Sequence, residues 1–189
     1  MKKNNRPFAK CPKCGELERT RLASLVLESM YPDQKASETD VLHISPENSL
    51  RINFQKNYKS YISADLHRKD VNHQFDIQKI PFSDESFDLV FASHVLEYPE
   101  DDRRAISEIR RILRKDGIAI LPVPLIHKKT KDNQVRNPMN RMMHEPGLDF
   151  FDRYREFFSS VETFGPEAFD SKFNLHEYET LNLLPVCKV

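Results

Sequence analysis

The stretch that decides the fold class of this chain is Asp40-Val41-Leu42-His43-Ile44-Ser45-Pro46-Glu47. Its first five residues predict a short strand. The next three have the form of a helix start, because Ser45 is a good N-cap, Pro46 fits the first helical position and Glu47 places an acid in the first turn. A strand that runs directly into a helix indicates an α/β protein.

The rest of the chain repeats this alternation of strands and helices. Apolar runs, and apolar residues at three- and four-residue spacing, mark the individual elements. Gly117 is expected to end one of the helices. Strands are predicted over residues 60–64, 87–92, 118–123 and 179–189, with a short extended piece at 75–77, and helices over residues 18–30, 46–58, 102–115 and 147–158. The predicted fold is a Rossmann-like doubly wound α/β sheet with three αβα layers, mostly parallel, with an antiparallel C-terminal strand.

Length and composition fit a single domain. The chain has 189 residues, and we expect one domain over residues 18–189, preceded by a cysteine-containing appendage over residues 1–17. No apolar run is long enough to cross a bilayer and no signal-peptide stretch follows the basic N-terminus, so we expect a cytoplasmic protein. The 29 basic and 29 acidic side chains balance. This balance argues against nucleic acid as a partner, because binding it requires phosphates to be neutralised.

The N-terminal appendage carries the turn Cys11-Pro12-Lys13-Cys14-Gly15. This form is typical of a zinc knuckle, in which two thiolates point at one metal ion. A tetrahedral site needs two further ligands, whereas Cys187 stands alone and the histidines are scattered. We therefore expect a metal-free turn, with Cys11 and Cys14 as the candidate ligands if zinc binds.

Three polar features follow predicted strands. They are the loop His43-Ile44-Ser45-Pro46-Glu47, the acid Asp65, and the segment Ser93-His94-Val95-Leu96-Glu97. In open α/β sheets, ligands bind beyond the carboxyl ends of the strands. Asp65 comes about twenty residues after the first loop, as expected for an acid that binds ribose hydroxyls. The sequence thus predicts a ligand site built from residues 41–97.

A long central segment resembles the signature of class I methyltransferases of the type-11 group. It reads Asp76-Ile77-Gln78-Lys79-Ile80-Pro81-Phe82-Ser83-Asp84-Glu85-Ser86-Phe87-Asp88-Leu89-Val90. Residues 93–98 and 108–117 continue the resemblance in the family order, and it covers about residues 41–124. Residues 11–19 and 42–47 resemble one bacterial subgroup, which has a cysteine-rich N-terminus.

The resemblance implies S-adenosylmethionine as cofactor and gives roles to individual residues. Asp65 would hold the ribose hydroxyls. Asp76 would accept from the exocyclic amine of the adenine, and Ile77 would pack on its ring. Ser93 and His94 would line the methionine end, near the transferring methyl group. The full set of implied cofactor-binding residues is His43, Ser45, Pro46, Glu47, Asp65, Leu66, Asp76, Ile77, Ser93 and His94.

The loop after the first strand departs from the family pattern. Most members have glycines there, whereas this chain has none between Met30 and Gly117. S-adenosylmethionine carries no pyrophosphate. The backbone therefore need not come as close to it as to a dinucleotide. The predicted helix start offers free N–H groups to the cofactor carboxylate, and Glu47 or His43 could meet its ammonium group.

The methyl acceptor is less well specified. A general base is needed only when the acceptor must lose a proton, and His94 is the candidate catalytic residue, with His144 and Glu145 behind it. Residues 127–141 form a basic loop that is too long for a plain connection and is therefore a candidate substrate loop. Such a loop would favour an anionic acceptor, for example a phosphorylated or acidic sugar.

Three functions remain open from the sequence. The leading one is methylation of a small molecule or glycan precursor, at oxygen. The second is a catalytically silent Rossmann-like module that acts as a binding partner, which the glycine-free loop favours. The third is an RNA-associated methyltransferase that uses the cysteine turn and the basic loop, against which the neutral net charge argues. The oligomeric state is not indicated.

Overall fold

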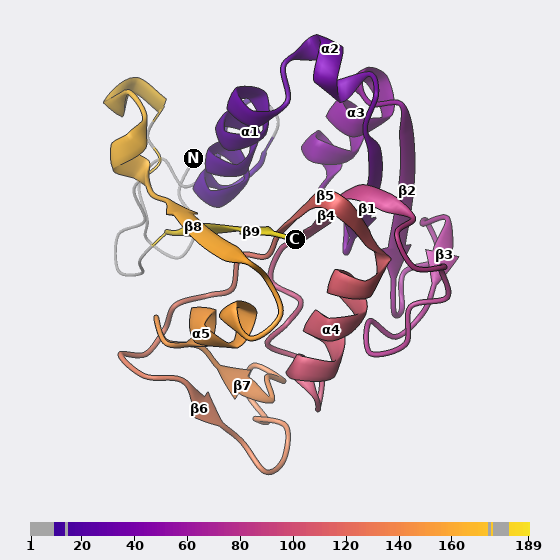
Figure 1. The fold of residues 1–189 in the computed structure, drawn as a ribbon. Coiled ribbons are helices and arrows are strands. Elements are labelled where there is room, and N and C mark those ends of the chain that lie inside the picture. Colours follow the sequence, from indigo (N-terminus) through magenta and orange to yellow (C-terminus); the bar gives the residue numbers. More distant parts are fainter. Residues whose placement is uncertain (1–9, 14, 174, 176–181) are drawn as a thin grey trace.

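The computed structural model of the chain describes residues 10–13, 15–173, 175 and 182–189. Helices and strands alternate along most of its length (Figure 1). The helices are α1 (Glu18–Met30), α2 (Asp33–Ala36), α3 (Asn48–Asn57), α4 (Asp102–Ile112) and α5 (Phe150–Arg155). The strands are β1 (Asp40–Ile44), β2 (Ser60–Asp65), β3 (His73–Gln74), β4 (Phe87–Ala92), β5 (Leu113–Ile120), β6 (Lys131–Asp132), β7 (His144–Glu145), β8 (Ser160–Phe164) and β9 (Leu184–Lys188).

The main sheet has seven strands in the order β3-β2-β1-β4-β5-β9-β8. The pairs β3–β2, β2–β1, β1–β4 and β4–β5 are parallel, whereas β9 runs antiparallel to both β5 and β8. The strand order reverses between β1 and β4, so a topological switch point lies at the carboxyl ends of these two strands. The predicted doubly wound sheet with its antiparallel C-terminal strand is confirmed.

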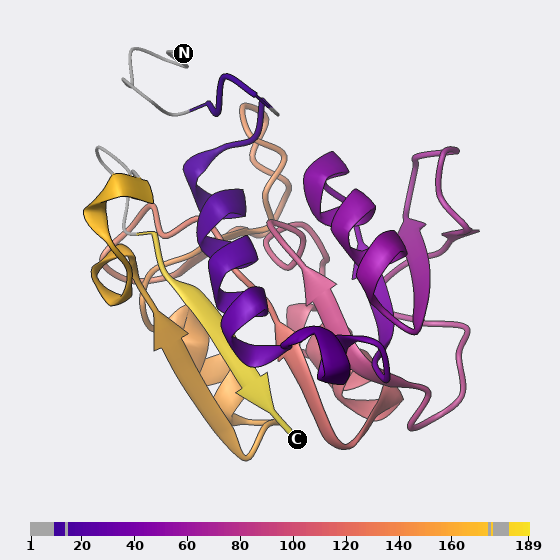
Figure 2. The same cartoon turned by 90° about the horizontal axis from the view of Figure 1, so that it is seen from above.

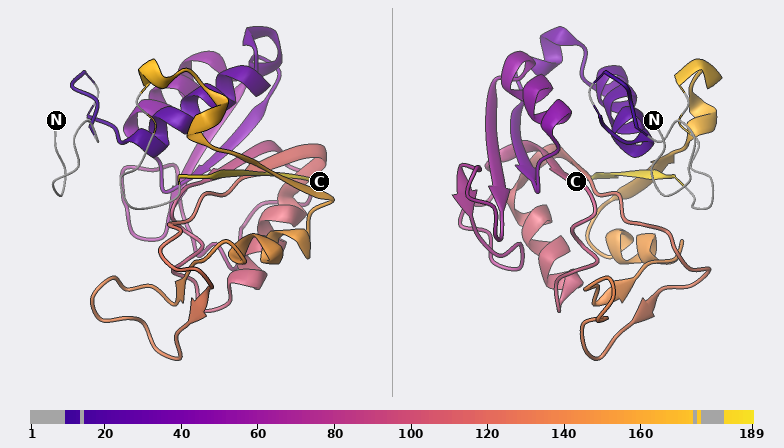
Figure 3. Two further views of the ribbon diagram at one scale, coloured as in Figure 1. Left: turned by 90° about the vertical axis from the view of Figure 1, so that its left-hand side faces the viewer. Right: turned by 180° about the vertical axis from the view of Figure 1, so that it is seen from behind.

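Helices cover both faces of this sheet. The helices α1 and α3 pack on one face, and α4 and α5 pack on the other (Figures 2 and 3). Val41 and Leu89 belong to the core under α1 and α3, whereas the next residues along, Leu42 and Val90, belong to the core with α4 and α5. Neighbouring residues of one strand enter opposite cores because side chains alternate across a sheet. This arrangement gives the three predicted αβα layers.

The predicted bounds of α1, β1 and β4 agree with the structure, but the helix after β1 begins later than predicted. Ser45 is not an N-cap residue. Its φ is +55°, and its N–H donates to the carbonyl of Ala64 at 2.8 Å, which continues the contact between β1 and β2. The helix α3 begins at Asn48, with Glu47 as its N-cap residue. The predicted start at residues 45–47 is wrong because Ser45 first turns the chain out of the sheet.

The prediction that Gly117 ends a helix is wrong, because this residue lies within β5. The helix α4 ends at Ile112, and Leu113 already pairs with Phe87 of β4. The next pair is Leu89 with Ile118, so the register shifts and residues 114–117 form a bulge. A Cβ atom at Gly117 would lie 3.0 Å from the carbonyl oxygen of Arg114. The glycine is therefore used for a close approach inside this bulge.

The segment after β5 contains a hairpin, β6–β7, that the sequence did not predict. Figure 3 shows it on the α4 and α5 side of the sheet. Arg153 of α5 connects the hairpin to the helices. Its guanidinium contacts Asp102 of α4 and donates to Asp132 of β6 at 2.7 Å. Arg153 and Asp102 are both buried. The edge strand β8 was also not predicted.

Among the described residues before α1, Glu16 contacts the domain. Lys10 and Leu17 form an isolated antiparallel bridge, and Glu16 Oε1 accepts a hydrogen bond from the N–H of Ser49 at 3.1 Å. The division between an appendage and a domain at residue 17 stays a prediction. In the described part of the chain, no helix is both long enough and apolar enough to span a bilayer.

Candidate active site

A cavity of about 610 Å³ lies at the carboxyl ends of β1, β2 and β4. Small-molecule sites typically occupy about 300–1,000 Å³, so this cavity has room for a nucleoside with an amino-acid tail. It lies at the switch point of the sheet, where ligands of such folds bind. Six residues of the predicted cofactor set line it: Ser45, Asp65, Leu66, Asp76, Ile77 and His94.

Asp65 ends β2 and is held in place by its own loop. Its Oδ1 accepts hydrogen bonds from the N–H groups of His67 at 2.8 Å and Arg68 at 2.9 Å. Burial alone would raise the pKa of this carboxyl, but the two backbone donors outweigh it, and the side chain of Ser45 adds a further hydrogen bond. The pKa of Asp65 is therefore lowered, and the residue presents a fixed negative charge to the cavity.

Asp76 and Ile77 come from the connection between β3 and β4. Gln78 donates to the carboxylate of Asp76 through its backbone N–H at 2.8 Å and through its side-chain amide at 3.0 Å. Ile77 is 6% exposed and, with Phe75, gives the cavity apolar surface. An oriented acid beside an apolar surface suits a flat ring that carries an amine.

His94 follows β4 and contributes to the cavity wall. Its φ is +54°, and its N–H donates to the carbonyl of Pro122 at 2.8 Å, which fixes the backbone from which the ring projects. Burial and the charge of Arg19 lower the pKa of this imidazole to about 3, although Glu47 opposes them. The ring is therefore neutral at neutral pH.

Four residues of the predicted cofactor set are not among the described residues that line the cavity: His43, Pro46, Glu47 and Ser93. His43 is fully buried in β1, and its Nε2 lies 2.9 Å from Oε2 of Glu47. Burial would raise the pKa of Glu47, but hydrogen bonds from His43 and from Ser93 lower it, so the carboxylate is charged. Direct contact of these four residues with a cofactor stays a prediction.

The basic loop supplies part of the cavity wall. Arg136 and Arg141 line the cavity together with Tyr98, whose carbonyl accepts from Nη1 of Arg136 at 2.6 Å. The length and charge of the loop marked it as a candidate substrate loop, but no pattern within it selected these two arginines. The sequence also gave no role to the remaining lining residues, which are Ile44, His67, Phe75, Gln78, Val95 and Pro99.

The candidate zinc ligands are described only in part. Cys11 lies within the described residues, whereas Cys14 lies outside them. Among the described residues, no group of three or more histidine, cysteine, aspartate or glutamate side chains could hold a metal ion. Cys187 is fully buried in β9. Zinc binding by Cys11 and Cys14 stays an untested alternative.

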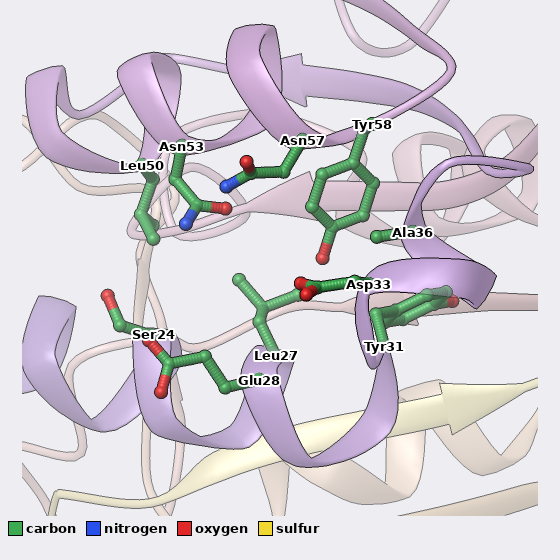
Figure 4. Close-up of a pocket in the computed structure, with 10 residues that line it drawn as sticks. All are labelled: Ser24, Leu27, Glu28, Tyr31, Asp33, Ala36, Leu50, Asn53, Asn57 and Tyr58. Atoms are coloured by element: carbon green, nitrogen blue, oxygen red, sulfur yellow. The ribbon is translucent and has the colours of Figure 1, made fainter.

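A second, much smaller cavity lies between α1, α2 and α3 (Figure 4). Its volume is about 50 Å³, which is room for about one or two water molecules. Tyr31 and Tyr58 contribute to its wall together with polar side chains such as Asn53. It cannot hold a nucleoside, so the cavity at the switch point is the candidate active site.

The fold is shared with known methyltransferases. The S-adenosylmethionine-dependent methyltransferase of Mesorhizobium loti is 15% identical, covers 89% of this chain and 98% of its own, and has a TM-score of 0.62. The 1,6-didemethyltoxoflavin-N1-methyltransferase of Burkholderia thailandensis, with bound 1,6-didemethyltoxoflavin and S-adenosylhomocysteine, is 14% identical over 90% of this chain and 77% of its own, with a TM-score of 0.65. The YcgJ protein of Bacillus subtilis is 13% identical over 89% and 96%, with a TM-score of 0.55. At these identities the likeness shows the fold.

The strand order and the antiparallel strand β9 define a Rossmann-like α/β fold, with the cavity at its switch point. Residues 35–121 match the family model described as a methyltransferase domain. The chain is accordingly a methyltransferase, and S-adenosylmethionine dependence is stated of the Mesorhizobium loti protein. No curated protein is similar enough in sequence to count as a match.

Proposed function

We propose that this methyltransferase acts on a small anionic molecule or glycan precursor and methylates it at an oxygen atom. The observation that carries the proposal is that one cavity gathers Asp65, Asp76 and Ile77 with Arg136 and Arg141. The same space thus offers carboxylates and apolar surface to a cofactor, and guanidinium groups to an acceptor.

The adenosine part of the cofactor would be held by residues that already face the cavity. Asp65 would accept hydrogen bonds from the ribose hydroxyls, because its charge is fixed by the backbone donors of its loop. Asp76 would accept from the adenine amine while Ile77 and Leu66 pack against the nucleoside. These residues fit the group, since each supplies a polar or apolar surface of the required kind at the cavity wall.

The methionine part would lie near Ser45 and the start of α3. The pair formed by Glu47 and His43 supplies an oriented carboxylate for the ammonium group. One amide of the helix start is already used, because the N–H of Ser49 donates to Glu16. S-adenosylmethionine, when bound, supplies a methyl group on a positively charged sulfur.

The acceptor would meet the arginines of the basic loop. Arg141 and Arg136 would bind a phosphate or carboxylate on the acceptor, because guanidinium groups pair with such anions through charged hydrogen bonds. His94 would take the proton that an acceptor hydroxyl loses, since its imidazole is neutral and lies at the cavity wall. A neutral ring with a free nitrogen is the form required of a general base.

Cofactor binding is tested by calorimetric titration with S-adenosylmethionine and S-adenosylhomocysteine. Asp65→Ala should weaken binding roughly 10- to 100-fold, because a hydrogen bond to a charged group contributes about 1.5–3 kcal/mol. Asp116→Asn is the matched control, since this acid is exposed at the amino end of the sheet. No binding by the unmodified protein would leave the silent-module interpretation as the better one.

Acceptor class is tested by S-adenosylhomocysteine formation with matched sets of sugar phosphates, uronic acids and neutral sugars. We expect turnover only with the anionic sets, and mass spectrometry of the product should place the methyl group on oxygen. Turnover restricted to the neutral sugars, or methylation at nitrogen, would contradict the proposal.

A further inference from the structure

Glu97 is a buried acid that the mechanism so far does not use. Its side chain is 0% exposed. No described residue forms a hydrogen bond with either of its carboxylate oxygens. Its backbone carbonyl does have partners, because it accepts from the N–H groups of Met143 and His144. Burial of a carboxyl group without a hydrogen-bond partner costs folding free energy. This cost indicates that the side chain of Glu97 has a function of its own.

The neighbour of this carboxyl at the cavity is His94. Oε1 of Glu97 lies 3.7 Å from Nδ1 of His94. This distance is longer than a hydrogen bond, but contacts of this kind often tighten when a ligand binds. The His94 side chain is 27% exposed and lines the cavity. The imidazole therefore borders the cavity and the buried carboxyl at once, which leaves Nε2 as the nitrogen that Glu97 does not engage.

Burial and nearby charges determine whether the proton lies on His94 or on Glu97. Arg19 of α1 and Glu47 at the start of α3 act on His94, and Arg19 also acts on Glu97. Burial raises the pKa of Glu97 to about 8, against its own backbone N–H and Arg19. Among the described residues, Tyr98 and Tyr154 are the other titratable groups that interact with this carboxyl. An imidazole with the lowered pKa of His94 is a weak base by itself. The two groups lie 3.7 Å apart, and ionisable groups that interact at short distance titrate as a pair.

We propose that Glu97 is a positioning residue that forms with His94 one proton-accepting pair for the acceptor hydroxyl. The inference rests on the proposed function. Once Glu97 has lost its own proton, Nε2 of His94 takes the hydroxyl proton while the carboxylate of Glu97 accepts from Nδ1–H. The hydroxyl oxygen forms the bond to the methyl carbon, and the carbon–sulfur bond breaks with its electron pair left on sulfur. The pair gains the one proton that the acceptor loses.

The experiment is a pH titration of the cofactor-free protein by NMR, from about pH 5 to about pH 10. The ring Cε1–Hε1 group of His94 and the carboxyl carbon of Glu97 are followed together. We expect both to report one shared step near pH 8, the pKa to which burial raises Glu97. Glu97→Gln should remove this step from the His94 signal. Glu100→Gln, which changes an exposed acid of the same segment, should leave it in place.

The readout separates this inference from the proposed function, because it needs neither cofactor nor acceptor. A His94 signal that titrates identically in the unmodified protein and in Glu97→Gln would overturn the pair. If that variant does not fold, the unmodified protein decides, since two unrelated midpoints for His94 and Glu97 would also overturn it. Cofactor binding, measured in parallel by calorimetry, tests the proposed function whichever way the titration turns out.

Discussion

Ser45 and His94 follow the neighbouring parallel strands β1 and β4, and both have left-handed backbones, with φ of +55° and +54°. Both side chains line the large cavity. A residue other than glycine pays roughly 1–2 kcal/mol for this conformation. The chain adopts this left-handed conformation at two residues of the switch point, where related folds usually have a glycine-rich loop.

Relief of this strain should be measurable at Ser45. Ser45→Gly should leave the free energy of unfolding unchanged or raise it by up to about 1 kcal/mol, whereas Ser45→Val should lower it by roughly 1–3 kcal/mol, because a β-branched residue tolerates positive φ poorly. Urea denaturation measures both. The same two changes at Ser160, in strand β8, should rank in the opposite order, since valine favours strands. Equal ranking at the two positions would contradict a strained Ser45.

The arginines at the cavity wall should act on the acceptor and not on the cofactor. Arg141→Gln should raise KM for an anionic acceptor roughly 10- to 100-fold, because one charged hydrogen bond contributes about 1.5–3 kcal/mol. The Kd for S-adenosylhomocysteine should not change. Lys129→Gln alters an exposed charge in the same segment that is not a cavity-lining residue, and should change neither constant. An equal loss with a neutral analogue would argue against recognition of the anion.

The buried contact between Arg153 and Asp102 should contribute strongly to stability. Arg153→Met removes the buried guanidinium from Asp102, whose side chain is 4% exposed, and leaves it only the longer contact with Arg103 at 3.9 Å among guanidinium groups of the described residues. Removal of one partner of a buried ion pair typically costs about 3–5 kcal/mol, and a loss of this size is expected in chemical denaturation. Arg155→Met breaks an exposed pair with Asp152 and is the matched control; exposed pairs contribute about 0–1 kcal/mol. Similar losses of unfolding free energy for both variants would contradict a special contribution of the buried contact between Arg153 and Asp102.

Glu145 should give the hairpin an acid-sensitive contribution. Hydrogen bonds from His127 and Asn137 lower the pKa of its carboxyl to about 2. A lowered folded-state pKa stabilises the protein above the unfolded value, near about 4.3, and this stabilisation is lost as pH falls toward 2. The difference in unfolding free energy between the unmodified protein and Glu145→Gln should therefore be largest above pH 5 and shrink below it. A difference that is constant across this range would contradict the assignment.

The sequence predicted the elements that are buried on both faces of the sheet. The apolar run Phe87–Ala92 admits few other interpretations, and its predicted bounds are those of β4; the next run, predicted over 118–123, lies in β5 at Leu113–Ile120 only in part. It failed where tertiary contacts override local signals. Ser45 and Pro46 have the form of a helix start, but the contact of Ser45 with Ala64 keeps the chain beside β2. The edge strand β8 is only half-buried or exposed along its length, so it lacks an apolar run.

The site divides in the same way. The spacing after the first strand predicted Asp65, and the family resemblance predicted Asp76 and Ile77; all three line the cavity. Arg136 and Arg141 reach it through the β6–β7 hairpin, whose course depends on Arg153 and other distant contacts. No local pattern encodes such a course. Glu97 was quoted within a motif, but its burial without a hydrogen-bond partner among the described residues is visible only in three dimensions.

The position of β9 has a consequence for synthesis of the chain on the ribosome. Among the strands that the structure describes it comes last in the sequence, yet it lies between β5 and β8 and pairs with both. The parallel strands β3, β2, β1, β4 and β5 can assemble while translation continues, because each has a partner that has already emerged or follows soon after. The edge strand β8 cannot join the sheet until β9 has left the exit tunnel, because β8 pairs with β9. Folding of this sheet therefore finishes only with its final strand, and until then β5 offers an open edge to other nascent chains and chaperones.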